Sequence, residues 1–445
     1  MMTLNVIEQA TIAAQQKNWS LLTECLQQLP VTKTSAGKGE ASIQLENECL
    51  EQILSLALEV LYSGDFRERW EVAKVLPKFG SCAIAPLISI LEDEDAEIEE
   101  RWFAGRILGE FDDPAVVTAL VESLKTADDE ELTVAAAAAL ANIGFPAVEA
   151  LTGLLADPNT RLLAVRSLAQ IRRSETIAPL MGVVEDPEAT IRAAAIEALG
   201  SFHDSRVPPI LIKALKDIAA QVRKEAVIGL GMRTDLLPKL DLVTHVRSLL
   251  FDFNLEVCQQ AAIALGRLGT DEAAAALYEV LLSPHTPIRL KVDIVRSLPQ
   301  TATSLEYLQK ALSVESPELW QEIIMVLGRV EEPKLVPLAA KILQSALDIG
   351  SPTAQNPKVK QAMAMTWGHL GDPLAIKPLI ELLADPDAGI RLHCIAALKK
   401  FPTAYEKLQQ LATDEKLTPE LKQGVAIALQ EWGLGAGGWG LGAGD

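Results

Sequence analysis

Tryptophan side chains lie at four places in this sequence where they could line a binding groove. Trp70, Trp102, Trp320 and Trp367 each lie in a segment whose apolar spacing predicts a helix, and His369 follows Trp367 by two residues. Because only 4% of the residues are aromatic, this placement suggests a groove for a protein partner or a flat chromophore, to which His369 would add a polar group. The alternative interpretation is that the four side chains pack in the core.

Two acidic runs lie one predicted repeat apart, and both fall in turns between helices. They are interpreted either as a solvated edge or as a surface that attracts a basic partner. The residues of this candidate acidic partner edge are Glu92, Asp93, Glu94, Asp95, Asp128, Asp129, Glu130 and Glu131.

The residue patterns of known catalytic and metal sites are absent from the sequence. The five cysteines are far apart and form no Cys-x-x-Cys pair, which predicts no metal site and suits a reducing cytoplasm. Cys258 is expected to be partly exposed, where its thiol could hold a metal or cluster jointly with a partner. His393 and Cys394 are adjacent, but neighbouring helix residues point in different directions, so a catalytic dyad is not expected. With no phosphate loop, dinucleotide fingerprint or hydrolase elbow, we predict no catalytic residues and no cofactor.

The composition excludes several classes of protein. A formal net charge of −20 argues against nucleic acid as the main partner, because phosphate binding needs a basic face. No run approaches the ~18 apolar residues of a membrane span. The first residues carry neither a basic region nor a continuous apolar stretch, so no signal peptide is expected. We predict a cytoplasmic protein that does not span a membrane.

The segments that carry these residues recur along the chain. Twelve of them share two positions seven residues apart, at steps of 28 to 40 residues. The first position, called here the arginine column, is occupied by Arg69, Arg101, Thr133, Arg161, Arg192, Arg223, Cys258, Lys291, Trp320, Lys360, Arg391 and Lys422. The second, the leucine column, is occupied by Leu76, Leu108, Leu140, Leu168, Leu199, Leu230, Leu265, Leu298, Leu327, Trp367, Leu398 and Leu429. This register predicts an all-α fold, an α-solenoid of about twelve helical hairpins with a period of about 31 residues.

The local sequence explains how each hairpin forms. Acidic turns such as Asp157-Pro158 and Asp385-Pro386 precede the second helix, where Asp can cap free N–H groups and Pro suits the first turn. The leucine column should be buried, so Leu199→Ala should cost roughly 2–5 kcal/mol.

The period and the pattern resemble the HEAT repeat in its short form, over about residues 50–431. The resemblance implies that arginines of the arginine column pair with turn Asp residues of a neighbouring repeat as a structural ladder, with anion binding as the alternative. That short form is seen in phycobilisome lyases, which attach open-chain bilins to cysteines of phycobiliproteins. The segments Arg101–Gly109 and Asp113–Val117 are similar to a lyase stretch with an Arg, two aromatic residues, a Leu-Gly pair and Asp-Pro-Ala-Val-Val. The lyases usually carry tryptophans where this chain has Arg106 and Ile107. The resemblance implies a bilin-binding site at Arg101, Trp102 and Arg106.

Two further HEAT families were compared with the sequence. The chain is similar, at family level, to the cyanobacterial IaiH family, which implies an A-type iron–sulfur carrier as the partner. The di-iron deoxyhypusine hydroxylases carry His-Glu pairs as metal ligands. None of the five histidines of this chain is followed by Glu, so this family does not fit the sequence.

The segments outside the regular repeat define the predicted domain organisation. We expect an N-terminal helical cap over residues 1–30, a flexible linker over 31–42, a repeat solenoid over 43–431 and a flexible Gly/Trp tail over 432–445. The longest step, between Trp320 and Lys360, contains an inserted loop around residues 346–357 that could decorate a binding face.

These observations favour a non-catalytic scaffold or chaperone that holds a protein partner on its concave face. The partner would be an A-type iron–sulfur carrier or phycobiliprotein subunits. The alternative is a bilin lyase or lyase subunit, for which the bound group would be a phycobilin. The residues predicted to contact the partner or the bilin are Arg101, Trp102, Arg106, Trp70, Trp320, Trp367 and His369.

Overall fold

The computed structural model describes residues 2–29, 31–33, 41–43, 47–126 and 129–435. Within these ranges the chain forms 26 α-helices, six 3₁₀ helices and one pair of three-residue strands, so the predicted all-α class is confirmed. Among the described residues no single helix is long and apolar enough to cross a membrane; one pair, Phe66–Ala73 with Leu76–Glu92, passes only in combination and is bent by 68°.

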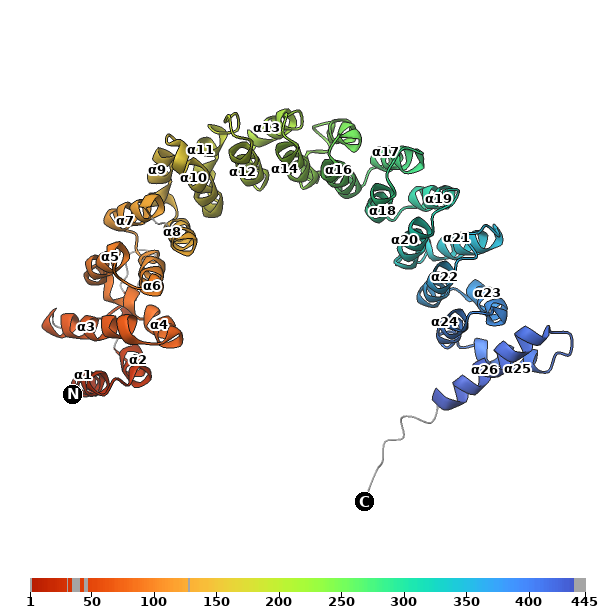
Figure 1. Cartoon of the computed structure of the whole chain (residues 1–445), viewed down its shortest axis with the longest axis horizontal. Coiled ribbons are helices and arrows are strands. Elements are labelled where there is room, and N and C mark those ends of the chain that lie inside the picture. Colours follow the sequence, from red (N-terminus) through yellow and green to blue (C-terminus); the bar gives the residue numbers. More distant parts are fainter. Residues whose placement is uncertain (1, 30, 34–40, 44–46, 127–128, 436–445) are drawn as a thin grey trace, which may run out of the picture. The chain divides into compact units, whose positions relative to one another are not determined.

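Twelve helical hairpins follow one another along the chain, as the repeat predicts (Figure 1). Their first helices are α3 (Asn47–Ser63), α5 (Ile84–Glu92), α7 (Pro114–Thr126), α9 (Phe145–Leu154), α11 (Ile177–Met181), α13 (Val207–Ala214), α15 (Leu242–Arg247), α17 (Asp271–Leu282), α19 (Ala302–Ala311), α21 (Val336–Asp348), α23 (Ile376–Glu381) and α25 (Ala404–Ala412). Their second helices are α4 (Phe66–Ala73), α6 (Ile98–Leu108), α8 (Glu130–Ile143), α10 (Pro158–Ile171), α12 (Ala189–Gly200), α14 (Ala220–Gly231), α16 (Leu255–Leu268), α18 (Ile288–Ser297), α20 (Pro317–Gly328), α22 (Pro357–Leu370), α24 (Ala388–Leu398) and α26 (Pro419–Gly435). The 3₁₀ helices are η1 (Leu76–Ala83), η2 (Ser174–Thr176), η3 (Thr234–Leu236), η4 (Ser248–Phe251), η5 (Pro373–Ala375) and η6 (Leu382–Ala384).

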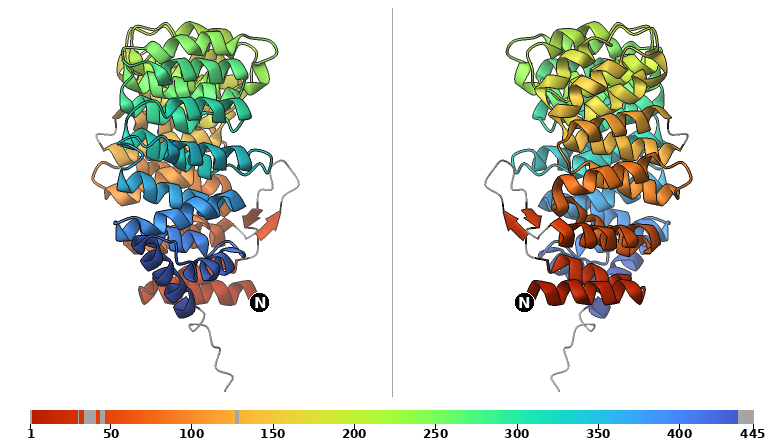
Figure 2. Two further views of the ribbon diagram at one scale, coloured as in Figure 1. Left: turned by 90° about the vertical axis from the view of Figure 1, so that its right-hand side faces the viewer. Right: turned by 90° about the vertical axis from the view of Figure 1, so that its left-hand side faces the viewer.

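The segments outside the hairpins differ in part from the prediction. Helices α1 (Met2–Gln15) and α2 (Trp19–Gln27) occupy the expected N-terminal cap. Strands β1 (Val31–Lys33) and β2 (Ala41–Ile43) lie at the two ends of the predicted linker and pair antiparallel beside the N-terminal hairpins (Figure 2). Residues 34–40 of that linker lie outside the described residues. Helix α26 continues into the predicted tail as far as Gly435, and residues 436–445 of that tail lie outside the described residues.

The inserted loop is packed against the neighbouring hairpin. The loop residues Thr353 and Ala354 are 5% and 0% exposed, and the hydroxyl of Thr353 donates a hydrogen bond to Glu315. Part of the insertion is therefore tied to the solenoid rather than held out from it.

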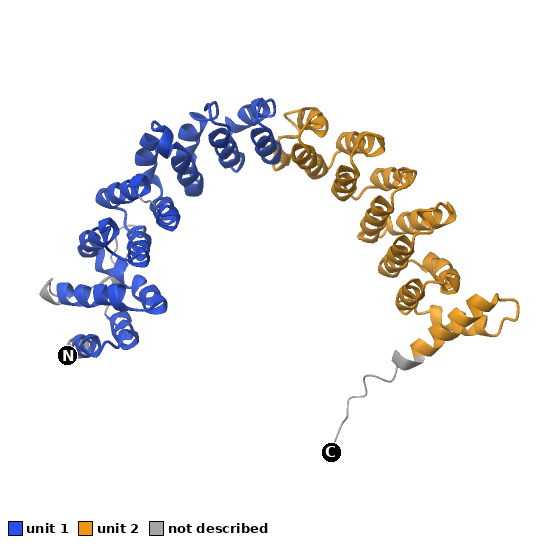
Figure 3. Ribbon diagram, in the orientation of Figure 1, with its two compact units in different colours: residues 1–229 blue, residues 230–445 orange. Residues whose placement is uncertain are grey.

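The chain divides into two compact units, and the single solenoid over residues 43–431 stays a prediction. The N-terminal unit comprises residues 1–229 and the C-terminal unit residues 230–445 (Figure 3). Within each unit the first helices form one layer and the second helices form the other, and consecutive second helices pack against each other.

The leucine column forms the centre of the core, as predicted. Its residues from Leu76 to Leu398 are at most 6% exposed, and Leu199 is fully buried. Each hairpin buries its apolar stripe on the next one, which is how a solenoid gains a continuous core. At the far end Leu429 is half-buried, because α26 is the last second helix of the array.

Glycines near the ends of the second helices allow neighbouring helices to approach closely. A Cβ atom added to Gly109 would lie 2.8 Å from the Cα of Ala139 in the next second helix. A Cβ atom added to Gly266 would lie 2.1 Å from the carbonyl oxygen of Ser297. Both distances are below van der Waals contact, so these positions accept only glycine without a shift of the helices.

Candidate functional site

Five side chains on helices α4 and α6 form an aromatic–arginine cluster in the N-terminal unit: Phe66, Trp70, Trp102, Phe103 and Arg106. The Phe66 and Trp70 rings stack at 6.1 Å between centroids, and Phe103 meets both Phe66 at 5.4 Å and Trp102 at 5.0 Å. The guanidinium carbon of Arg106 lies 4.3 Å from the Trp70 ring centroid and 5.7 Å from that of Trp102. Arg106 therefore lies within cation–π distance of two indole rings.

The local sequence orders this cluster before any ligand binds. Asp65 caps α4 by accepting a hydrogen bond from the backbone N–H of Glu68, whose side chain bonds back to the backbone of Asp65. Phe103 is fully buried and anchors the cluster, whereas Phe66 is 57% exposed. Trp70 and Trp102 are half-buried, and Arg106 is exposed. The result is an apolar surface with a fixed positive charge, which suits a protein side chain or a flat anionic group.

The structure brings together Trp70, Trp102 and Arg106 from the predicted site but not Arg101. The Nε of Arg101 donates to the carbonyl of Leu91 at 3.0 Å, so this arginine holds the turn of its own hairpin. The sequence analysis missed Phe66 and Phe103. Phe66 precedes Trp70 by four residues, a spacing that places both on one face of a helix and could have indicated it.

The other predicted tryptophans belong to the core, which corrects their assignment to a groove. Trp320 and Trp367 are 0% and 1% exposed and lie in the C-terminal unit. The Nε1 of Trp320 donates to the carbonyl of Val314 at 3.0 Å, which satisfies the one polar atom of the ring. Trp367 occupies the leucine column and packs as the leucines do. His369 is exposed, so it lies on the surface without the aromatic neighbour that the prediction gave it.

Residues of the arginine column share one hydrogen-bonding role. Arg161, Arg192, Arg391, Cys258 and Trp320 each donate to the backbone carbonyl six residues earlier, at distances of 2.7 to 3.1 Å. This bond closes the turn before the second helix. Cys258 and Trp320 make the same bond, so a side chain without a charge can occupy the column if its donor reaches this carbonyl. Cys258 is only 5% exposed, which corrects the expectation of a partly exposed thiol. A thiol buried to this extent is poorly placed to bind a ligand.

The predicted ladder between neighbouring repeats is present. Arg161 pairs with Asp186 at 2.6 Å, and Lys360 pairs with Asp385 at 2.8 Å. In each case the carboxylate belongs to the turn of the next hairpin, 25 residues along the chain. The charges are mutually neutralised and mostly buried, so these cations serve the structure.

The first acidic run is partly neutralised within the N-terminal unit. Arg69, which is 4% exposed, pairs with Glu97, Glu99 and Glu100 at 3.0 to 3.5 Å. Burial raises the pKa of Glu100, against the opposing effect of Arg69. The four carboxylates before them, over residues 92–95, are exposed.

The second acidic run has mixed roles. Asp129 caps α8 by accepting hydrogen bonds from the backbone of Glu131 and Leu132, while the side chains of Glu130 and Glu131 are exposed. Asp128 lies outside the described residues. The carboxylates of residues 92–95, Glu130 and Glu131 are thus exposed at the surface. Their role as an edge that binds a partner stays a prediction.

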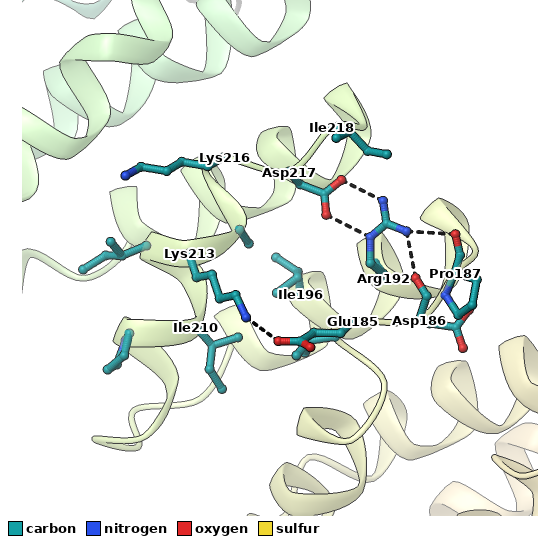
Figure 4. A pocket seen from close by; sticks show the side chains of 14 residues that line it. Glu185, Asp186, Pro187, Arg192, Ile196, Ile210, Lys213, Lys216, Asp217 and Ile218 are labelled. Atoms are coloured by element: carbon teal, nitrogen blue, oxygen red, sulfur yellow. Dashed lines mark hydrogen bonds and ion pairs between the residues drawn. The ribbon is translucent and has the colours of Figure 1, made fainter.

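A groove of about 710 Å³ lies between two neighbouring hairpins of the N-terminal unit (Figure 4). Ile196, Ile210 and the 93% exposed Ile218 contribute apolar surface to it. The guanidinium of Arg192 lines the groove but is fully engaged by Asp217 and by backbone carbonyls. The sequence analysis did not identify this groove, because the turns that form it contain no motif.

The described cysteines and acidic residues form no obvious reactive centre. Burial raises the pKa of the Cys394 thiol to about 12, and the neighbouring His393 contacts the carbonyl of Gly389 at 2.6 Å. Among the residues that the structure covers, no group of three or more His, Cys, Asp or Glu side chains is placed to hold a metal ion.

Comparison with known proteins places the repeat in a family and gives several relatives. The chain is 24% identical to bovine (Bos taurus) deoxyhypusine hydroxylase over 57% of this chain and 91% of that protein. It is 26% identical to phycocyanin operon protein Z of Pseudanabaena tenuis over 36% of this chain and 82% of that protein. Among solved structures, the karyopherin Kap121p bound to Nup53p is 16% identical, covers 92% of this chain and 55% of its own, and has a TM-score of 0.48.

The family itself is recognised over most of the sequence. HEAT repeats are matched at residues 50–141, 84–160, 146–231, 208–298 and 352–430, which together span more than half of the chain. These ranges coincide with the hairpins from α3 to α18 and from α22 to α26. The chain therefore belongs to the HEAT-repeat family.

Proposed function

We propose that this chain is a non-catalytic HEAT-repeat scaffold or chaperone that binds a protein partner on the exposed face of its second helices. The observation that supports it most is the aromatic–arginine cluster of α4 and α6. Its rings are ordered against each other, yet Phe66 is 57% exposed and Arg106 is at the surface. A cluster that served only the core would not leave these groups in water.

The chemistry of the cluster is that of a protein-binding hot spot. Trp and Arg are the residues most enriched where partners lose the most affinity on alanine substitution. Because Arg106 is already held over Trp70 at 4.3 Å, little side-chain entropy is lost when a partner covers it. The cluster would thus provide most of the binding free energy for the partner from a small area. The rest of the exposed face would provide a surface that is complementary in shape to the partner.

Two partners fit the proposal. An A-type iron–sulfur carrier follows from the resemblance to the IaiH family. Phycobiliprotein subunits follow from the lyase-like stretch over residues 101–117 and from the similarity to phycocyanin operon protein Z. For both, the chain supplies a surface and no reacting group.

A second candidate function is attachment of a phycobilin to a phycobiliprotein. The half-buried rings of Trp70 and Trp102 offer flat faces to a tetrapyrrole, and Arg106 offers a positive charge to a propionate. The similarity to deoxyhypusine hydroxylases adds a second enzyme class. Hydroxylation is not proposed, because the sequence lacks the His-Glu pairs that this chemistry would use.

The test is direct binding of purified candidates to the full chain. An A-type iron–sulfur carrier and apo-phycobiliprotein subunits are titrated separately by calorimetry against wild type and Arg106→Ala. Loss of a hot spot should cost about 2 kcal/mol, a roughly thirtyfold rise in Kd. Adding free phycobilin to the phycobiliprotein arm, with covalent attachment followed by zinc-induced fluorescence on a denaturing gel, separates the scaffold from the lyase.

The matched control is Arg166→Ala. Arg166 lies five residues after Arg161, as Arg106 lies five residues after Arg101, and none of the aromatic contacts among the described residues involves it. Equal loss of affinity in both variants, or no binding of either candidate, would contradict the proposal.

A further inference from the structure

Three consecutive second helices of the C-terminal unit expose an apolar row. Met325 on α20, Met365 on α22 and Leu392 on α24 are 42%, 51% and 56% exposed. The helices are in direct register, because the Thr366 hydroxyl donates to the carbonyl of Ile324 at 3.2 Å. Met325 follows Ile324 in the sequence, and Met365 precedes Thr366. The two methionines therefore lie beside each other on the exposed face.

A row of polar side chains, made of the cations Arg329 and Lys400 together with the imidazole of His369, borders this apolar row at the C-terminal ends of the same helices. Arg329, His369 and Lys400 are all exposed, and none of the ion pairs among the described residues involves them. A Cβ atom on Gly368 would lie 3.6 Å from the Lys400 side chain, so Lys400 lies next to the end of α22 and hence to His369. The two rows together form a face that we call the Met–cation face.

The helices of this face carry few carboxylates although the chain carries a net charge of −20, and the nearest exposed ones, Glu331 and Glu332, follow Arg329 in the loop after α20. Neither α22 nor α24 contains Asp or Glu. The two carboxylates of α20 lie elsewhere: Glu318 is in the first turn, at the opposite end from Arg329, and Glu322 is 3% exposed and pairs with Arg296 of α18 at 2.7 Å. The positive potential of the Met–cation face is therefore not cancelled by its own helices.

We propose that the Met–cation face binds an acidic amphipathic helix of a partner protein. The apolar side of that helix would cover Met325, Met365 and Leu392, and its carboxylates would face Arg329, His369 and Lys400. Packed helices lie about 8–10 Å apart, so three helices span about 20 Å, which matches a helix of about 15 residues at 1.5 Å per residue. Methionine side chains adapt their shape to such a helix, as they do on other helix-binding surfaces.

This site rests on the proposed scaffold function only in that both bind a protein. It shares no residue with the aromatic–arginine cluster, and its partner chemistry is acidic rather than a flat or aromatic group. The charge complementarity favours a partner over a second copy of this chain. In a copy, the acidic turn at residues 92–95 is too short to offer the apolar side of an amphipathic helix that Met325 and Met365 require.

The test uses a phage library of random peptides about 15 residues long, about four helical turns, selected on the full-length chain. The enriched peptides should carry net negative charge and apolar residues at three- and four-residue spacing. The strongest peptide, measured by fluorescence anisotropy, should bind Met325→Glu/Met365→Glu and Arg329→Glu/Lys400→Glu at least tenfold more weakly than wild type. A version with Lys in place of each carboxylate should bind the Arg329→Glu/Lys400→Glu variant better than it binds wild type.

Val134→Glu is the matched control, because Val134 is a 58% exposed apolar residue on α8, a second helix of the other unit. It should keep wild-type affinity, and all variants should keep the wild-type melting temperature. Enrichment of neutral or basic peptides, no enrichment, or equal loss in Val134→Glu would overturn the proposal. So would a concentration-dependent dimer that Met325→Glu/Met365→Glu abolishes. Trp102→Ala should bind the peptide normally, so failure here is separable from failure of the aromatic–arginine cluster.

Discussion

Arg192 and Asp217 join two neighbouring hairpins through a pair of charge-assisted hydrogen bonds. The Nε of Arg192 lies 2.8 Å from Oδ2 of Asp217, and Nη2 lies 2.7 Å from Oδ1 (Figure 4). Asp217 also accepts the backbone N–H of Ala219 at 2.8 Å, at the start of the next second helix. One carboxylate therefore caps a helix and holds the preceding repeat, which couples the folding of the two hairpins.

Asp217→Asn should destabilise the protein by about 1.5–3 kcal/mol, the usual value for a hydrogen bond to a charged group. The amide keeps the shape but loses the charge that the largely buried guanidinium of Arg192 needs. Urea unfolding at pH 7, followed by circular dichroism, measures the difference. Glu185→Gln is the matched control, because Glu185 pairs with Lys213 across the same groove but both side chains are exposed. It should have no measurable effect.

The contribution of Asp217 should also depend on pH with a defined sign. Hydrogen bonding to Arg192 lowers the pKa of Asp217 in the folded protein below its ordinary value. The stabilisation is therefore complete above the pKa of the unfolded chain, near 4, and is lost as the pH falls through the lower folded value. The difference in unfolding free energy between wild type and Asp217→Asn should shrink as the pH falls below about 4. A difference that is constant with pH would show that the charge is not responsible.

The repeat could be predicted from the sequence because each column has one physical duty. The leucine column is buried from Leu76 to Leu398, and in several repeats the arginine column closes the turn before the second helix. The occupants Cys258 and Trp320 look like exceptions in the sequence. In the structure they donate to the same carbonyl position as Arg161, Arg192 and Arg391 do, so an uncharged hydrogen-bond donor can also occupy the column.

The candidate site was predicted only in part, because burial depends on rotation about the helix axis. Trp70 and Trp102 lie one residue after the arginine column, whereas Trp320 lies in that column and Trp367 in the leucine column. One residue rotates a side chain by about 100° around a helix, enough to move it from the core to the surface. The prediction used residue type alone and therefore placed all four tryptophans in one groove. Their positions relative to the arginine and leucine columns would have separated the surface pair from the buried pair.

The close approach of the second helices makes Gly266→Ala destabilising. Alanine normally stabilises a helix relative to glycine by about 1 kcal/mol. Here the new Cβ would lie 2.1 Å from the carbonyl oxygen of Ser297, so α16 and α18 must move apart, at a cost of about 1–3 kcal/mol. Gly153→Ala is the control with the opposite sign, because a Cβ at Gly153 meets nothing within 4 Å. Denaturant unfolding of both variants should shift in opposite directions, and equal shifts would contradict the packing argument.

Thiol reactivity should follow the burial of the cysteines. Cys82 is exposed, whereas Cys394 is fully buried with its pKa raised to about 12, so its thiolate is scarce at neutral pH. Cys82→Ser should remove one rapidly reacting equivalent when the native protein is treated with Ellman's reagent at pH 8. Cys394→Ser should leave the native reaction unchanged and lose one equivalent only in denaturant. Rapid loss of an equivalent in native Cys394→Ser would show that this helix opens.

Trp320 and Trp102 should respond oppositely to alanine substitution, because one belongs to the core and the other to the surface cluster. Trp320→Ala removes a fully buried side chain and its hydrogen bond to Val314, and should cost about 3–5 kcal/mol of stability. Trp102→Ala removes a half-buried ring, so it should melt within a few degrees of wild type while weakening partner binding. Thermal melting and calorimetric titration of both variants separate the two roles. A Trp102→Ala variant that loses as much stability as Trp320→Ala would assign the aromatic–arginine cluster to the core and remove the main support for its function in binding.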